Sequence, residues 1–206
     1  MTTLLILDYL SVAIFAATGA LAASRAQLDV VGFVFLAGLT AVGGGTLRDL
    51  LLDRDIFWIV DPTNLAVAAF VAILTFFTAH LLESRLRTLV WLDAAALAIA
   101  VAAGVNAARA DGQSMPVILV MGMITGTVGG LARDVVANEV PLVLKQGELY
   151  ATAALAGAAA AVLAATLSDA ALVPPLACIG VAFGLRAGSL AFGWRLPVYR
   201  ARPPRR

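Results

Sequence analysis

Long apolar runs alternate with short polar breaks along the whole chain. Each run is long enough to cross the hydrocarbon core of a bilayer as a helix, which takes about 20 residues. The breaks contain charged residues, proline and glycine, which are typical of loops between membrane spans. The pattern therefore predicts an all-α integral membrane protein with seven transmembrane helices. The seven predicted spans lie at about residues 4–23, 31–51, 63–82, 91–109, 115–136, 148–167 and 174–193.

The composition excludes an ordinary soluble domain. Of the 206 residues, 62% are hydrophobic and only 13% are charged, whereas about 25% are charged in a typical soluble domain. No stretch has the composition of a soluble domain or a flexible linker, so we expect residues 1–206 to form a single transmembrane domain. The first span carries Asp8 and lacks a basic start, which favours a membrane helix over a signal peptide.

The first half of the chain is repeated in the second half, 85 positions later. Each copy contains three spans, and an odd number of spans inserts the second copy into the membrane upside down. We therefore expect two inverted three-helix repeats, at about 4–82 and 91–167, and a seventh helix at about 174–193. The aligned pairs are Asp8 with Asp93, Gly19 with Gly104, Gly44-Gly45 with Gly129-Gly130, and Arg48-Asp49 with Arg133-Asp134.

Basic residues predict the orientation, because cytoplasmic loops of membrane proteins are enriched in arginine and lysine. The side of the C-terminus, with the tail at 195–206, holds ten basic residues outside the seventh span, and the other side holds three. We therefore expect a multi-pass protein of the inner (plasma) membrane with its C-terminus in the cytoplasm and its N-terminus outside. The ten are Arg25, Arg85, Arg87, Arg133, Lys145, Arg195, Arg200, Arg202, Arg205 and Arg206, and the three are Arg48, Arg54 and Arg109.

The outer face is predicted to be acidic. An acidic mouth would concentrate cations, although solvated loops are often acidic without a functional reason. We interpret the basic tail on the opposite face as a determinant of topology, and we expect no nucleic-acid partner. The predicted outer aspartates are Asp49, Asp53, Asp55, Asp61, Asp111 and Asp169.

Glycines cluster near the end of the second span and near the same place in its repeat. Three consecutive glycines weaken a helix by about 1 kcal/mol each, so a bend or an unwound turn is expected at 43–45. Freed carbonyl groups must face protein or water, where they could replace part of the hydration shell of a cation. The alternative is close helix packing. The predicted path residues are Gly43, Gly44, Gly45, Thr46, Thr127, Gly129 and Gly130.

Charged side chains within spans are expensive and call for partners. For Arg48 and Arg133 we expect Asp49 and Asp134, or carboxylates on neighbouring helices, as partners; the alternative is that the arginines reach the headgroups. Arg186 lies inside the seventh span, and we expect it to form a structural ion pair with Asp93 or with Asp134.

The sequence contains no pattern of a catalytic or metal site. His80 is the only histidine and has no cysteine or carboxylate at ligand spacing. Phosphate-binding, dinucleotide-binding and serine-hydrolase motifs are absent from the sequence. Asp49 and Asp134 are expected near opposite faces, too far apart to share a proton as in an aspartyl protease. We therefore expect no enzyme and no cofactor other than a permeant K⁺ or Na⁺ ion.

The motifs at 43–49 (GGGTLRD), 127–134 (TVGGLARD), 138–141 (NEVP) and 192–197 (FGWRLP) resemble the prokaryotic branch of the trimeric intracellular cation channel (TRIC) family. The resemblance covers essentially the whole chain. It implies a membrane-embedded homotrimer in which each subunit has its own pore between bent second and fifth spans. It also implies permeation by monovalent cations, glycine motifs along the pore, and Arg48 and Arg133 as basic pore residues. Because a fixed positive charge obstructs a narrow cation path, we expect these arginines to gate the path, with Asp49 and Asp134 as counter-charges.

Two departures from the family pattern limit what the resemblance implies. The second motif has Val128 in place of the first glycine, so the second bend is expected to be milder. Animal members bind a phosphoinositide through basic residues that include lysine, whereas Lys145 is the only lysine here, so that site is not expected. Related bacterial sequences are also described as glycine transporters. A carrier of a small solute such as glycine is therefore the alternative function, because inverted repeats with broken helices suit carriers equally well.

Overall fold

The computed structural model describes residues 2–82 and 84–199, which fold into seven long helices and three short ones. Six of the long helices have the length and composition to cross a membrane, and α7 is apolar but shorter, with 17 residues. The predicted all-α fold with seven apolar helices is therefore confirmed, and the predicted tail at 200–206 lies outside the described residues. The elements are α1 (Thr2–Arg25), α2 (Val30–Leu51), α3 (Phe57–Val60), α4 (Thr63–Thr78), η1 (Ala79–Leu81), α5 (Arg85–Ala110), α6 (Met115–Val136), η2 (Leu142–Leu144), α7 (Ala151–Leu167) and α8 (Val173–Phe192).

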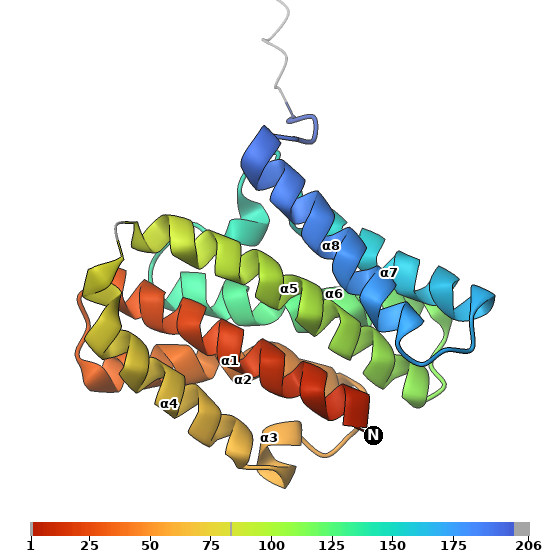
Figure 1. The fold of residues 1–206 in the computed structure, drawn as a ribbon, viewed down its shortest axis with the longest axis horizontal. Coiled ribbons are helices and arrows are strands. Elements are labelled where there is room, and N and C mark those ends of the chain that lie inside the picture. The colour runs from red at the N-terminus through yellow and green to blue at the C-terminus, as the bar shows by residue number, and fades with distance from the viewer. Residues whose placement is uncertain (1, 83, 200–206) are drawn as a thin grey trace, which may run out of the picture.

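The long helices form two bundles of three that meet at the centre of the molecule. Helices α1, α2 and α4 pack against one another, as do α5, α6 and α7. The bundles meet where α1 packs against α5 and α2 packs against α6, and α8 covers α5 and α7 (Figure 1). In Figure 1 α1 begins at the side of the molecule where α5 ends, so the two bundles are inverted. We call the side where α1 begins the N-terminal side and the opposite one the tail side.

The backbone repeats the 85-residue spacing in the loops as well as in the helices. Asp53 and Asn138 follow α2 and α6, and they have left-handed φ angles of 53° and 55°. Asp and Asn tolerate this conformation better than most residues because their short side chains bond locally. Gln27 and Gly112 occupy the equivalent left-handed positions before α2 and α6. The duplication seen in the sequence is therefore a duplication of helix ends and turns.

Small residues let the helices within each bundle approach closely. A Cβ atom added at Gly19 would lie 2.6 Å from the carbonyl oxygen of Leu36, and one at Gly104 would lie 2.7 Å from that of Met121. These contacts join α1 to α2 and α5 to α6 at aligned positions. In lipid there is no hydrophobic force between helices, so such close packing is a main source of their association.

Candidate functional site

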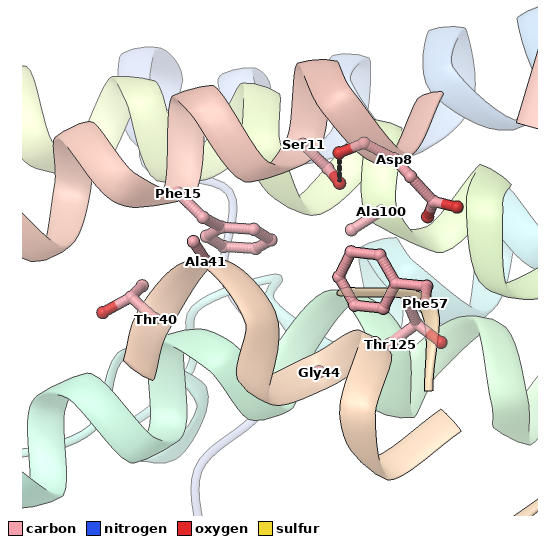
Figure 2. Close-up of a pocket in the computed structure, with 10 residues that line it drawn as sticks. Asp8, Ser11, Phe15, Thr40, Ala41, Gly44, Phe57, Ala100 and Thr125 are labelled. Atoms are coloured by element: carbon pink, nitrogen blue, oxygen red, sulfur yellow. Dashed lines mark hydrogen bonds between the residues drawn. The ribbon is translucent and has the colours of Figure 1, made fainter. Parts of the chain in front are cut away.

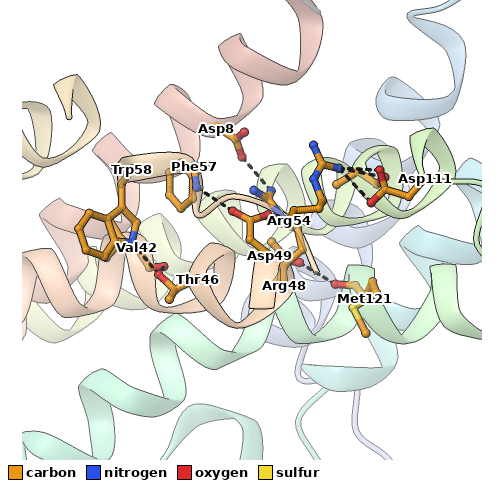
Figure 3. A network of polar contacts seen from close by, with 12 residues as sticks. Asp8, Val42, Thr46, Arg48, Asp49, Arg54, Phe57, Trp58, Asp111 and Met121 are labelled. Carbon is orange, nitrogen blue, oxygen red and sulfur yellow. Dashed lines mark hydrogen bonds and ion pairs between the residues drawn. The ribbon is translucent and has the colours of Figure 1, made fainter. Parts of the chain in front are cut away.

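The first arginine centre joins α1, α2 and α3. Arg48 is 2% exposed, and its Nε donates to Asp49 at 2.7 Å while its Nη1 donates to Asp8 at 3.0 Å. The second carboxylate oxygen of Asp49 accepts the backbone N–H of Phe57 at 2.9 Å. The guanidinium also lies over the Phe57 ring, 5.5 Å from its centroid (Figure 3). Arg48 therefore bonds to carboxylates inside the protein.

The second arginine centre repeats these contacts with residues 85 positions later. Arg133 is fully buried and donates to Asp134 and to Asp93, both at 2.8 Å. Asp134 accepts the backbone N–H of Leu142 at 2.8 Å, as Asp49 accepts that of Phe57. The centre has one additional member, because Arg133 also donates to the Thr18 hydroxyl at 2.9 Å.

Each centre holds one guanidinium and two carboxylates, so each carries a formal charge of −1 when all groups are ionised. Buried charges of this kind are tolerated only when they are paired and hydrogen-bonded. The surplus carboxylate gives both centres a negative electrostatic potential, which favours cations over anions.

The first centre opens into a cavity of about 580 Å³, which we call the vestibule. Four aspartates besides Asp8 line it, with Arg48 and Arg54 as the basic residues. Tyr9 and Thr63 donate hydrogen bonds to Asp61, which lowers the pKa of this loop carboxyl and keeps it ionised. The vestibule is therefore an acidic mouth on the N-terminal side. Its lining residues are Asp8, Arg48, Asp49, Asp53, Arg54, Asp55, Phe57, Val60, Asp61 and Asn64.

A second, much smaller cavity lies next to the vestibule and shares Asp8 and Phe57 with it (Figure 2). Its volume is about 10 Å³, and we call it the chamber. A cavity of about this size holds a single water molecule. The vestibule and the chamber together form a candidate ion path that narrows between α1, α2, α5 and α6. The chamber is lined by Asp8, Ser11, Phe15, Thr40, Ala41, Gly44, Gly45, Phe57, Ala100 and Thr125.

The predicted unwound turn at 43–45 does not form, because α2 stays helical through all three glycines. A Cβ atom added at Gly44 would overlap the carbonyl oxygen of Thr125, and one at Gly129 would overlap that of Thr40. The glycines thus bring the backbones of α2 and α6 into contact. Two helices packed this closely exclude water, and without water an opened helix would leave its carbonyl groups unsatisfied. Helix packing, the alternative interpretation, accounts for Gly44 and Gly129 in this structure.

The other predicted path residues surround this contact at different places. Gly43 lies beside Gly129, Gly45 lies under the Phe57 ring, and Gly130 lies near the Tyr150 hydroxyl. Thr46 and Thr127 do not line the chamber, and their hydroxyls donate to carbonyls four residues earlier, at 2.7 and 2.9 Å.

Sequence reasoning missed Asp8, Phe57, Thr40 and Thr125 as lining residues of the candidate path. The two threonines carried a usable signal, because they lie 85 positions apart and each precedes Gly44 or Gly129 by four residues. Such spacing places each threonine on the same helix face as its glycine. Phe57 carried no such signal, because its aligned residue is Leu142.

The predicted pairing of Arg186 with Asp93 or Asp134 is wrong. Arg186 is fully buried and donates to Glu148 at 2.7 Å, and its guanidinium lies 4.9 Å from the centroid of the Tyr150 ring. Asp93 and Asp134 are instead the partners of Arg133. The prediction failed because the apolar pattern places residue 148 inside the predicted span at about 148–167. In the structure α7 begins at Ala151, so Glu148 lies in the preceding loop and can contact α8.

Metal-binding groups do not gather in the described part of the chain. Within residues 2–82 and 84–199 no cluster of three or more His, Cys, Asp or Glu side chains could hold a metal ion.

Comparison with known proteins gives consistent relatives. The chain matches the family model described as "Glycine transporter" over residues 5–80 and 90–166, so each matched segment covers one repeat. It is 43% identical over 157 residues to the UPF0126 inner membrane protein YadS of Escherichia coli, covering 73% of each chain. It is also 30% identical over 205 residues to the UPF0126 membrane protein YvgT of Bacillus subtilis, covering 93% of this chain and 94% of that one.

Solved structures extend the similarity to the fold. The TRIC trimeric intracellular cation channel orthologue from Rhodobacter sphaeroides is 41% identical and matches with a TM-score of 0.90, covering 94% of this chain and all of that one. A structure that describes conductance through TRIC cation channels is 27% identical, with a TM-score of 0.85 and coverage of 97% and 98%. These matches, the apolar helices of this chain and its two inverted bundles all indicate a membrane protein with the fold of these channels. The chain is a multi-pass membrane protein that belongs to the prokaryotic TRIC cation channel family, whose sequence model carries the description "Glycine transporter".

Proposed function

We propose that the protein is a channel for monovalent cations, K⁺ or Na⁺, and that ions enter through the vestibule and pass between α2 and α6. The observation that carries this proposal is the taper from an acidic cavity of about 580 Å³ to a chamber of about 10 Å³ at Asp8. Negative charge at a wide mouth raises the local concentration of cations. The similarity to TRIC cation channels supports the same function.

Arg48 and Arg133 are proposed to gate this path, with Asp49 and Asp134 as counter-charges. A fixed positive charge obstructs a narrow cation path unless a carboxylate neutralises it or the side chain moves away. Both arginines are neutralised by two carboxylates in this structure, and α2 touches α6 between them. Opening then requires α2 and α6 to separate at Gly44 and Gly129. If an arginine moves within the membrane field, opening becomes voltage-dependent by about 2.3 kcal/mol per charge per 100 mV for a full crossing.

The assembly is proposed to be a homotrimer with one path in each subunit, with the N-terminal side outside and the tail side in the cytoplasm. The relative from Rhodobacter sphaeroides is a trimeric intracellular cation channel orthologue, which supports this assembly. The excess of basic residues on the tail side supports the orientation. The mass of the detergent-solubilised complex is expected to correspond to three chains, and a stable monomer that still conducts would contradict the assembly.

The decisive experiment is recording from the purified protein in planar bilayers. Discrete current steps carried by K⁺ and Na⁺, and not by Cl⁻, are the expected result. In the same recordings Arg48→Ala is expected to change the open probability or its voltage dependence while cation selectivity is kept. Mutant recordings indistinguishable from the parent would return Arg48 to a structural role.

A carrier of a small solute such as glycine is the second candidate. It is supported by the description of the matching family model and by the inverted repeats. Proteoliposomes separate the two functions, because a carrier gives slow, saturable and coupled uptake. Saturable uptake of labelled glycine without current steps would favour the carrier.

A further inference from the structure

Phe57 occupies the boundary between the vestibule and the chamber. It is one of only two residues that line both cavities, and the other is Asp8. Its ring is part of the chamber wall (Figure 2). A Cβ atom added at Gly45 on α2 would lie 2.5 Å from this ring. An aromatic ring between two parts of a path is an apolar constriction, and such constrictions stop ions by excluding the water that hydrates them.

The position of this ring is set by the first arginine centre. Phe57 is the first residue of α3, a helix of only four residues whose N-cap, Ile56, supplies no side-chain hydrogen bond. The N–H of Phe57 is instead held by Asp49 at 2.9 Å, and Asp49 also holds Arg48 at 2.7 Å. One carboxylate therefore ties the ring to the arginine, whose guanidinium lies over the same ring (Figure 3).

We propose that Phe57 closes the path between the vestibule and the chamber, and that Asp49 is the residue that positions it. The inference rests on the proposed cation channel and adds the residue that blocks it. A movement of Arg48 would disturb Asp49 and, through the N–H of Phe57, would shift the ring. The arrangement thereby couples the charge centre to an apolar plug.

The experiment measures access to the chamber directly. Ser11→Cys places a thiol in the chamber, in a Cys178→Ala background that removes the chain's single cysteine. The probe is 2-aminoethyl methanethiosulfonate, a small cationic thiol reagent, and labelling is followed by intact mass. Phe57→Ala is expected to speed labelling at least tenfold. The matched control is Ile59→Ala on the same short helix, because Ile59 is 59% exposed and lines neither cavity.

Equal labelling rates in Phe57→Ala and Ile59→Ala would overturn the proposal. If Phe57→Ala fails to elute as a single folded species, Phe57→Leu provides the same test with a smaller expected increase. For the positioning role, Asp49→Ala is expected to speed labelling, and Asp49→Asn, which keeps an oxygen to accept the Phe57 N–H, is expected to restore the slow rate. Equal labelling rates in Asp49→Ala and Asp49→Asn would show that Asp49 does not position Phe57.

Labelling does not require ion conduction, so the two proposals can fail separately. Fast labelling in Phe57→Ala without current from any variant would disprove the channel and keep the plug. Current steps from the parent protein with unchanged labelling in Phe57→Ala would keep the channel and disprove the plug.

Discussion

The two arginine centres share three equivalent hydrogen bonds but differ in their access to water. Asp8 lines the vestibule, whereas its counterpart Asp93 is fully buried. The difference comes from the neighbouring residues. Thr18 accepts a hydrogen bond from Arg133, whereas the aligned Ala103 has no polar side chain to bond to Arg48. Tyr150 lies near Asp93, whereas the aligned residue in the first copy is Leu65. The same duplicated residues therefore form one centre that borders a cavity and one centre that is sealed. The proposed entry of ions therefore lies at the first centre, and the second centre, which is proposed to take part in gating, is expected to contribute more to stability.

The largest expected effect tests this division. Arg133→Met leaves two carboxylates buried without their partner, and breaking such a pair typically costs about 3–5 kcal/mol. Arg48→Met leaves Asp8 facing the vestibule, where water can solvate it, so we expect a smaller loss of about 1–3 kcal/mol. The free energies of unfolding are compared by SDS titration in mixed micelles. Equal losses in the two variants would mean that both centres are sealed alike.

The contact between α2 and α6 at Gly44 and Gly129 is expected to contribute equally to stability in the two copies of the repeat. Gly44→Ala and Gly129→Ala each push a Cβ atom into a backbone carbonyl of the other helix, so each is expected to lower the free energy of unfolding by about 1–3 kcal/mol. Gly38→Ala on α2 is the matched control, because no atom lies within 4 Å of its added Cβ. This control is expected to be neutral or to gain up to about 1 kcal/mol from helix propensity. The same unfolding titration measures all three variants. If Gly38→Ala lowers the free energy of unfolding as much as the other two variants do, close packing does not explain Gly44 and Gly129.

The extra hydrogen bond of the sealed centre has a smaller expected effect than the loss of Arg133. Thr18→Val keeps the shape of the side chain and removes the acceptor of Arg133. Because the donor is charged and buried, we expect a loss of about 1.5–3 kcal/mol. Thr78→Val on α4 is the control, since that hydroxyl is exposed and bonds only to the Leu74 carbonyl of its own helix. Loss of cation current without loss of stability in Thr18→Val would place the path at the second centre instead.

The smallest expected effects come from two surface pairs that occupy equivalent places on opposite sides. Arg54 pairs with Asp111 at 3.3 Å on the N-terminal side, and Arg25 pairs with Glu139 at 3.1 Å on the tail side. Arg54 and Glu139 are aligned in the repeat, so the charge is reversed between the copies. Exposed pairs typically contribute about 0–1 kcal/mol, and Arg54→Ala and Arg25→Ala are each expected to fall in that range at 0.15 M salt. A larger loss in either variant would show that its loop is part of the rigid core.

The number of apolar helices, the duplication and its inversion could all be predicted from the sequence. These features depend on the length and composition of apolar runs and on an 85-residue spacing, all of which are local or periodic properties. Arg48, Arg133 and Arg186 could also be identified from the sequence as residues that need partners, because a charge within an apolar run is costly.

The partner of each buried charge, and the copy of the repeat that borders a cavity, depend on how the helices pack. Arg186 pairs with Glu148 because the loop before α7 reaches α8, and no spacing in the sequence reports that contact. The glycines at 43–45 stay helical because α6 packs directly on them, although their intrinsic propensity favours a break. Phe57 is a candidate plug because the vestibule and the chamber meet at its ring, and this contact is made only in the folded protein. In each case the deciding contact joins residues far apart in the chain, so its energy depends on packing between helices, which the pattern within each helix does not specify.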